Sequence, residues 1–161
     1  MPKRPRKTDT ARIAEWVGDT IDLYVMLYAM TPHEDALRSL YKSMWRSILE
    51  VYDQSLGRIK MASLEEITRR VAERVSVDII IHRHPELPVD RIEYYASRIA
   101  NVIYADIWRY IVSYLTVKRR IEEVEYRERK VRRPRYWTSH HMIYYVLRKI
   151  EEELGREQLG L

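Results

Sequence analysis

Three basic side chains recur at intervals of four residues in the segment 31–57. Residues four apart lie on the same face of an α-helix, so Arg38, Lys42 and Arg46 would form a continuous basic stripe if this segment is helical. Arg and Lys side chains bind phosphate oxygens through charge-assisted hydrogen bonds. The spacing therefore predicts a phosphate-binding track as one role of the stripe, and these three residues are candidate nucleic-acid-binding residues.

Acidic residues recur at a similar interval in the preceding segment, 9–30, which leaves a second role open for the same stripe. If the segments 9–30 and 31–57 form an antiparallel helical hairpin, acidic and basic side chains would lie level across it. The expected pairs are Glu15 with Arg46, Asp19 with Lys42, and Asp22 with Arg38. An interhelical ion-pair ladder is the interpretation that this register favours, and the phosphate track is the alternative.

Positive charge is also dense before the first predicted helix. The formal net charge of the chain is +5, and residues 1–7 carry four basic and no acidic side chains. Such an uneven distribution is typical of proteins that bind nucleic acids or anionic surfaces, although a solvated tail has the same composition. We expect the N-terminal arm, residues 1–8, and the helix that follows it to bind nucleic acid through Lys3, Arg4, Arg6, Lys7 and Arg12.

Arg135 and His140 are separated by four residues in the sequence RYWTSH. This Rx4H spacing resembles the motif of the HEPN family of helical ribonucleases, and the resemblance covers six residues. It implies that the Arg and the His would polarise a phosphate and serve acid–base chemistry at an RNA backbone. Because Pro134 places Arg135 before the predicted helix rather than inside it, a ribonuclease is the less favoured alternative, and we expect no enzymatic activity.

The sequence predicts no metal site and no cofactor. Cysteine is absent, which excludes thiol catalysis and cysteine-ligated metal centres. Histidine ligands on one helix face lie three or four residues apart, and the close histidine pairs of this chain have other spacings. The five histidines are His33, His82, His84, His140 and His141.

The positions of apolar residues predict an all-α protein with a single helical domain over residues 9–161. Apolar side chains recur every three or four residues through most of the chain, which is the pattern of helices with one buried face. The low content of Gly, four residues, and Pro, six residues, makes an all-β fold with many tight turns improbable. Five helices are expected, over residues 9–30, 31–57, 63–82, 89–130 and 139–155.

Capping residues mark the expected starts of three of these helices. Thr31 and Ser63 each precede a Glu by three residues, which is the spacing of a capping box. Ser139 or Thr138 is expected to cap the last helix. The β-branched run 77–81 is compatible with a helix end or a short strand, and we assign it to the helix.

The predicted helix 89–130 is longer than a compact domain of this length requires. Some 40 residues at 1.5 Å each give about 60 Å, so its basic end should extend beyond the helical bundle. Aromatic side chains occupy more than one of its faces, which is typical of a helix that packs against a second subunit as well as its own domain. We expect Tyr104 and Trp108 to form intersubunit contacts.

The composition is typical of proteins adapted to heat, with 22 Arg, no Cys, one Asn and two Gln. This composition, the basic arm, the all-α body and the long aromatic helix together resemble the major capsid proteins of filamentous viruses of hot-spring archaea. The resemblance is to the pattern of the whole chain, so it assigns no role to any single residue.

This resemblance implies a structural protein of the virion that is present in the host cytoplasm during assembly. It implies dimers of one chain, or of two related capsid proteins, stacked in a helical filament around double-stranded DNA in the A form. Some members of that family carry a lipid envelope. A free DNA- or RNA-binding regulator is the alternative function. No stretch of the chain has the roughly 18 apolar residues of a membrane span, so we expect no transmembrane helix.

Overall fold

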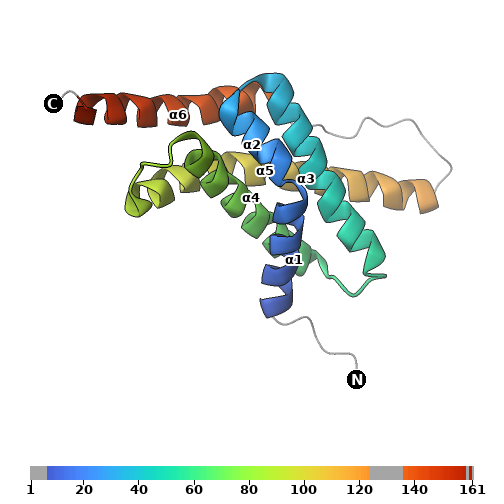
Figure 1. Ribbon diagram of the computed structural model, residues 1–161. Coiled ribbons are helices and arrows are strands. Elements are labelled where there is room, and N and C mark those ends of the chain that lie inside the picture. Colours follow the sequence, from blue (N-terminus) through green and yellow to red (C-terminus); the bar gives the residue numbers. More distant parts are fainter. Residues whose placement is uncertain (1–6, 124–135, 159, 161) are drawn as a thin grey trace.

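The computed structural model describes residues 7–123, 136–158 and 160, and these residues form an all-α protein (Figure 1). No strand occurs within these ranges, so the predicted fold class is confirmed. The described residues form six helices: α1 (Lys7–Thr20), α2 (Asp22–Met30), α3 (Glu34–Gln54), α4 (Met61–Arg83), α5 (Val89–Glu123) and α6 (Tyr136–Gln158).

The predicted helix 9–30 is divided into α1 and α2 by a turn at Ile21. The backbone of Ile21 has φ −100° and ψ 4°, which lies outside the α-helical region. The sequence gives no signal for this turn, because Val17, Ile21 and Val25 keep the apolar spacing of a single helix and all three are buried. The described part of the chain therefore has six helices where the sequence predicted five.

Helix α4 packs against α1, α2 and α5, whereas α6 packs against α5 and α3. The β-branched run 77–81 belongs to α4, as predicted, and Ile79 and Ile80 in it are fully buried. Burial of these side chains outweighs the small helix preference that β-branched residues lose. The core therefore forms around α4 and the adjoining face of α5.

Helix α3 begins at Glu34 and is capped by His33, not by Thr31. Nδ1 of His33 accepts a hydrogen bond from the backbone N–H of Asp35 at 3.1 Å. The backbone N–H of Thr31 donates instead to the carbonyl oxygen of Leu27 at 3.0 Å, so Thr31 ends α2. The capping box predicted at Thr31 is wrong, because this residue already closes the preceding helix.

The predicted caps of the next helices also lie inside them. Helix α4 begins two residues before Ser63 and follows Lys60, whose side chain forms no capping hydrogen bond. Helix α6 begins three residues before Ser139 and extends three residues past its predicted end. Ser139 is buried, and its hydroxyl group donates to the carboxylate of Asp106 in α5. This serine therefore joins two helices and does not start one.

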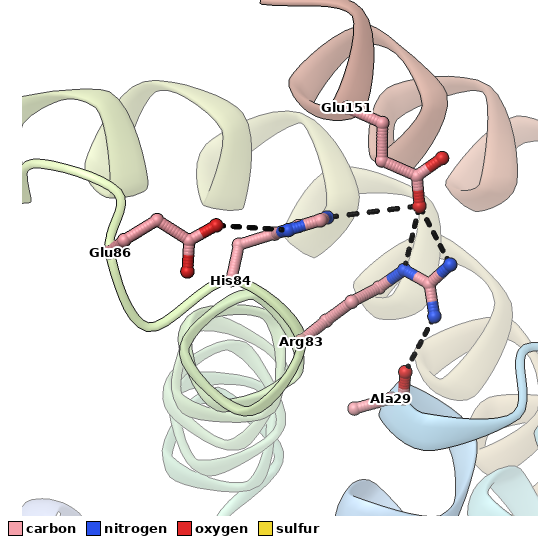
Figure 2. Close-up of polar contacts among 5 residues, drawn as sticks. All are labelled: Ala29, Arg83, His84, Glu86 and Glu151. Atoms are coloured by element: carbon pink, nitrogen blue, oxygen red, sulfur yellow. Dashed lines mark hydrogen bonds and ion pairs between the residues drawn. The ribbon is translucent and has the colours of Figure 1, made fainter. Parts of the chain in front are cut away.

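The C-terminal end of α4 is fixed to α2 and α6 by Arg83 (Figure 2). Nη1 of Arg83 donates to the carbonyl oxygen of Ala29 at 3.0 Å, which satisfies a carbonyl group in the last turn of α2. Nε and Nη2 donate to Oε1 of Glu151 in α6 at 3.1 and 2.7 Å. The ring of His84 lies between Glu86 and Glu151, 3.7 and 3.8 Å from their carboxylates, and burial lowers its pKa.

Helix α5 has 35 residues and ends at Glu123. The predicted continuation to residue 130 lies outside the described residues. The C-terminal ends of α5 and α6 extend from opposite sides of the bundle (Figure 1). Among the described residues, no helix is both long enough and apolar enough to cross a membrane.

Candidate nucleic-acid interface

The basic stripe predicted on the second helical segment lies on the exposed face of α3. Arg38, Lys42 and Arg46 are all exposed. The opposite face of α3 is buried in the core through Leu37, Leu40, Tyr41, Met44 and Ile48. This separation follows from the apolar spacing of the segment, which the sequence already showed. The three basic residues extend over about 12 Å along the helix axis.

The predicted ion-pair ladder between this stripe and the first helical segment is wrong. Arg74 of α4 occupies the acidic side of α1: its Nη2 donates to Asp19 at 2.5 Å and its Nη1 donates to the carbonyl oxygen of Glu15 at 2.7 Å. Within the described part of the chain, no ion pair joins the stripe to α1 or α2. The ladder required the acidic side of the first segment to face α3, whereas Asp19 of α1 faces Arg74 of α4.

Gly18 makes the contact between Arg74 and α1 possible. A Cβ atom at Gly18 would lie 2.6 to 2.7 Å from three side-chain atoms of Arg74, well inside van der Waals contact. The missing side chain therefore leaves a passage across α1 for the guanidinium group. Nothing in the sequence linked Gly18 to Arg74, because they are far apart in the chain and lie on different helices.

The two arginines of the stripe rest against aromatic rings. The guanidinium carbon of Arg38 lies 5.3 Å from the ring centroid of Tyr136, and that of Arg46 lies 5.7 Å from the ring of Trp45. Arg38 also lies 3.7 Å from Glu34 and from Asp35 in its own helix, a separation at which exposed ion pairs contribute little. The guanidinium group of each arginine therefore lies near an aromatic ring, while the residue as a whole stays exposed.

Lys42, between the two arginines, has no ion pair among the residues that the structure describes. An amine without an acidic partner keeps its full attraction for an external anion. The stripe ends in acidic residues on both sides, with Asp35 near its start and Asp53 beyond its end. Asp53 contacts the ammonium group of Lys118 in α5 at 3.5 Å, which reduces the acidic charge at that end.

Aromatic residues of α5 and α6 form the support behind the stripe. The rings of Trp45 and Tyr110 have centroids 4.5 Å apart, and Tyr110 stacks on Tyr114 at 6.5 Å. Tyr41 lies 5.8 Å from Tyr136, and burial raises the pKa of its hydroxyl group. Sequence reasoning assigned these residues to helix faces but did not show that they meet behind α3. Contacts between helices distant in the chain have no signal in a single sequence.

Of the remaining predicted nucleic-acid-binding residues, the structure describes the side chain of Arg12 only. Lys3, Arg4 and Arg6 lie outside the described residues. Lys7 begins α1, but its side chain also lies outside the described part of the chain. Arg12 is exposed on α1. The structure thus places the three basic residues of α3 together, and the contribution of the arm remains a prediction.

The two predicted intersubunit residues have partners within the chain. The hydroxyl group of Tyr104 donates to Oε1 of Glu65 at 2.6 Å, and Arg69 lies 4.4 Å from the centroid of its ring. Burial and the neighbouring Glu65 raise the pKa of Tyr104 to about 12. Trp108 is half-buried and packs against the core. Both residues therefore contribute to the packing of the domain, and their role between subunits stays a prediction.

His140, the histidine of the Rx4H spacing, faces the interior of the bundle. Its Nδ1 lies 2.8 Å from the hydroxyl oxygen of Tyr28 in α2. Burial and the nearby His33 lower the pKa of His140, which favours the neutral ring. Arg135 lies outside the described residues, so the geometry of the pair stays untested.

The described residues contain no group of three or more His, Asp or Glu side chains arranged to hold a metal ion. Comparison with known proteins finds no matching family model, no matching curated protein and no matching solved structure. The geometry of the α3 surface is therefore the main support for a functional assignment.

Proposed function

We propose that this protein coats double-stranded DNA without reading its sequence, as a subunit of a helical filament. The exposed stripe Arg38, Lys42 and Arg46 on α3 is the surface that contacts the phosphate groups, and the basic N-terminal arm adds further contacts. The observation that supports this proposal is that Arg74 takes the acidic side of α1. Because α1 therefore does not neutralise α3, the positive charge of the stripe is available to an external polyanion.

The chemistry of the stripe suits phosphate groups better than base edges. Arg and Lys donate to phosphate oxygens of any nucleotide, whereas sequence is read mainly by side chains that enter a groove and match donors and acceptors. The hydroxyl group of the exposed Ser39 donates to the carbonyl oxygen of Asp35 within α3. We therefore expect the affinity to depend on salt and only weakly on sequence.

Assembly turns a weak contact into stable coating. A single copy offers three basic residues on α3, and the free energy of several such copies on one duplex adds when the copies also bind one another. The heat-adapted composition and the resemblance to filamentous virus capsid proteins support a structural role of this kind in a virion. A continuation of α5 beyond the bundle would provide further surface for contacts between copies.

The test compares two double variants that remove the same charge from different surfaces. Lys42→Ala with Arg46→Ala removes two cations of the stripe, and Lys60→Ala with Arg98→Ala removes two exposed cations, one directly before α4 and one in α5. Binding to duplexes of unrelated sequence is measured by fluorescence anisotropy at several salt concentrations. We expect the stripe variant to reduce the slope of log K against log salt by about 1.8, since each lost phosphate contact contributes about 0.9.

The control variant should bind nearly as the parent protein does. Equal slopes for the stripe variant and the parent would show that α3 does not contact phosphate groups. Strong preference for one duplex sequence would favour the regulator instead. Electron microscopy of the parent protein with DNA provides the second readout, because the proposal requires filaments of uniform diameter.

A further inference from the structure

Helix α2 is apolar on both its buried and its exposed side. Asp22 is the only charged residue among its nine residues. Val25, Tyr28 and Ala29 face the core, while Leu23 and Met30 on the other side are 57% and 67% exposed. The exposed apolar residues of this helix and the adjoining end of α1, here called the α2 face, are Trp16, Leu23, Tyr24, Met26, Leu27 and Met30. A continuous apolar surface of this kind is typical of an interaction site.

Helix α6 carries a second exposed apolar surface, here called the α6 face. Trp137, Met142 and Tyr145 are more than half exposed, on the side of the helix opposite the buried Ile143 and Leu147. The ring of Trp137 stacks on His141 with centroids 4.9 Å apart. The ammonium group of Lys149 lies 5.4 Å from the ring centroid of Tyr145. Aromatic rings held in this way lose little side-chain entropy when a partner binds.

The two faces carry opposite charge. Residues 13–30, which include the α2 face, contain three acidic side chains and no basic one. Residues 136–149, which include the α6 face, contain Arg148 and Lys149 and no acidic side chain. The ammonium group of Lys149 lies 3.8 Å from the carboxylate of Glu152 in the next turn, so Arg148 is the basic residue of this edge without an ion pair among the described residues. Asp19 forms an ion pair with Arg74, whereas Asp22 lies at the start of α2, beside Leu23. An apolar surface with an acidic edge therefore occurs in the same chain as an apolar surface with a basic edge.

We propose that the α2 face of one copy binds the α6 face of a second copy of this chain. Apolar burial would provide the attraction, and the charged edges would set the orientation. The acidic edge of the α2 face repels DNA phosphates and anionic lipid headgroups, which makes a protein surface with a basic edge the better partner. The α6 face is such a surface, and it is present at the same concentration as the α2 face.

This contact would join two different surfaces of the molecule. Helix α2 packs on α4 and α3, α6 packs on α5 and α3, and Tyr28 of α2 lies 2.8 Å from His140 of α6. A reciprocal contact would close a pair by two-fold symmetry, whereas a non-reciprocal contact leaves one unused face on each copy, so that further copies add in the same direction. The proposed filament requires the non-reciprocal form. The inference gives the proposed filament a defined contact, but it requires no DNA and is tested without it.

The first experiment uses two variants that each damage one face. Leu27→Glu with Met30→Glu places charge in the α2 face, and Met142→Glu with Tyr145→Glu places charge in the α6 face. Sedimentation velocity of the protein without DNA measures self-association. We expect each variant alone to self-associate at least about tenfold more weakly than the parent protein, because a charge without a partner is costly to bury.

Mixing the two variants gives the sharper result. The first variant keeps its α6 face and the second keeps its α2 face, so an equimolar mixture should form a one-to-one complex and nothing larger. The matched control, Leu56→Glu with Val89→Glu, changes two exposed apolar residues outside both faces and should assemble as the parent does. Circular dichroism confirms that each variant is folded.

A charge exchange tests the orientation. Asp22→Lys and Lys149→Glu should each weaken self-association, and the double variant should recover part of the loss, because the changed charges attract again. Independent effects of the two changes would contradict this pairing of the edges.

Three other results would overturn the inference. These are a parent protein that stays monomeric at its highest soluble concentration, variants that fail to combine when mixed, and binding of the α2 face to phosphatidylcholine vesicles in place of a second copy. The outcome is independent of the DNA-binding proposal. Self-association without any DNA affinity would leave this contact intact and reject the proposed coating of DNA. DNA binding by a strict monomer would reject this contact but not the affinity of the protein for DNA.

Discussion

The hydroxyl group of Tyr28 in α2 lies 2.8 Å from Nδ1 of His140 in α6, which joins two segments 112 residues apart in the sequence. Burial raises the pKa of Tyr28, so its hydroxyl group keeps its proton and can donate it to the ring nitrogen. Burial also lowers the pKa of His140, so the ring is neutral and can accept that hydrogen bond. With a neutral ring, the hydroxyl group of Tyr28 donates and Nδ1 of His140 accepts.

We expect the stability of the fold to fall on acidification through pH 6.5. An unfolded histidine has a pKa near 6.5, and the pKa of the folded His140 lies below this value. The unfolded chain therefore binds a proton more readily, and stability present above pH 6.5 is lost as the pH falls toward the pKa of the folded state. His84, whose pKa burial also lowers, acts in the same direction.

Thermal melting at a series of pH values measures this dependence. His140→Gln should reduce the slope of melting temperature against pH below 6.5, and the remaining slope would come from His84. His82→Gln provides a matched control for the loss of an imidazole group from an exposed position. A slope that is the same in the His140 variant and the parent would show that His140 does not carry the dependence.

The contact between Arg83 and Glu151 should contribute measurably to stability. Removing the guanidinium group by Arg83→Ala breaks two hydrogen bonds to Glu151 and leaves the carbonyl oxygen of Ala29 without its donor. We expect a loss of about 2 kcal/mol in the free energy of unfolding, because hydrogen bonds to charged groups contribute more than neutral ones. Arg98→Ala removes an exposed arginine from α5 and should cost much less.

A double-mutant cycle with Glu151→Gln separates the pair from other effects of each change. Urea denaturation gives the four free energies. Strict additivity of the two single changes would mean that the side chains do not interact in solution.

Gly18→Ala should have different effects on stability in two backgrounds. In the parent, the new methyl group displaces Arg74 from Asp19 and cancels the gain in helix propensity. In the Arg74→Ala background nothing is displaced, so the same change should stabilise the protein by up to about 1 kcal/mol. Gly155→Ala has no heavy atom within 4 Å of the new methyl group and should stabilise both backgrounds alike.

Arg46→Glu should reduce DNA binding and leave the fold almost unchanged. Arg46 is exposed and rests only against the ring of its neighbour Trp45, so we expect a change in stability within about 0.5 kcal/mol. Adding Glu15→Arg tests the ladder directly, because restored stability in the double variant would require the two side chains to face each other. We expect no restoration, as Glu15 lies on α1 beside Arg74.

The apolar spacing was sufficient to predict the class and most of the helices. Repeated burial, as at Ile79 and Ile80, has a direct signal in the order of residues. Helix ends were predicted less well, because Thr31 and Ser139 have capping side chains that the fold uses otherwise. A local motif shows what a residue is able to do, and its neighbours in space decide which of its possible contacts forms.

The α3 stripe was identified from spacing alone, but its partners were not. The ladder assumed that the first segment turns its acidic side to α3, whereas Asp19 pairs with Arg74 of α4. Arg74 was never a candidate partner, because Asp19 precedes it by 55 residues. Pairings at that distance depend on helix packing, for which one sequence has no periodic signal.

The passage of Arg74 over Gly18 has a mechanical consequence. The N-terminal arm continues directly into α1, and Arg74 fastens α1 to α4 on the arm side of the turn at Ile21. A load on α1 is therefore shared directly with the central helix α4 through the Arg74 contact, in addition to the packing of α1 on α3 and its chain connection to α2.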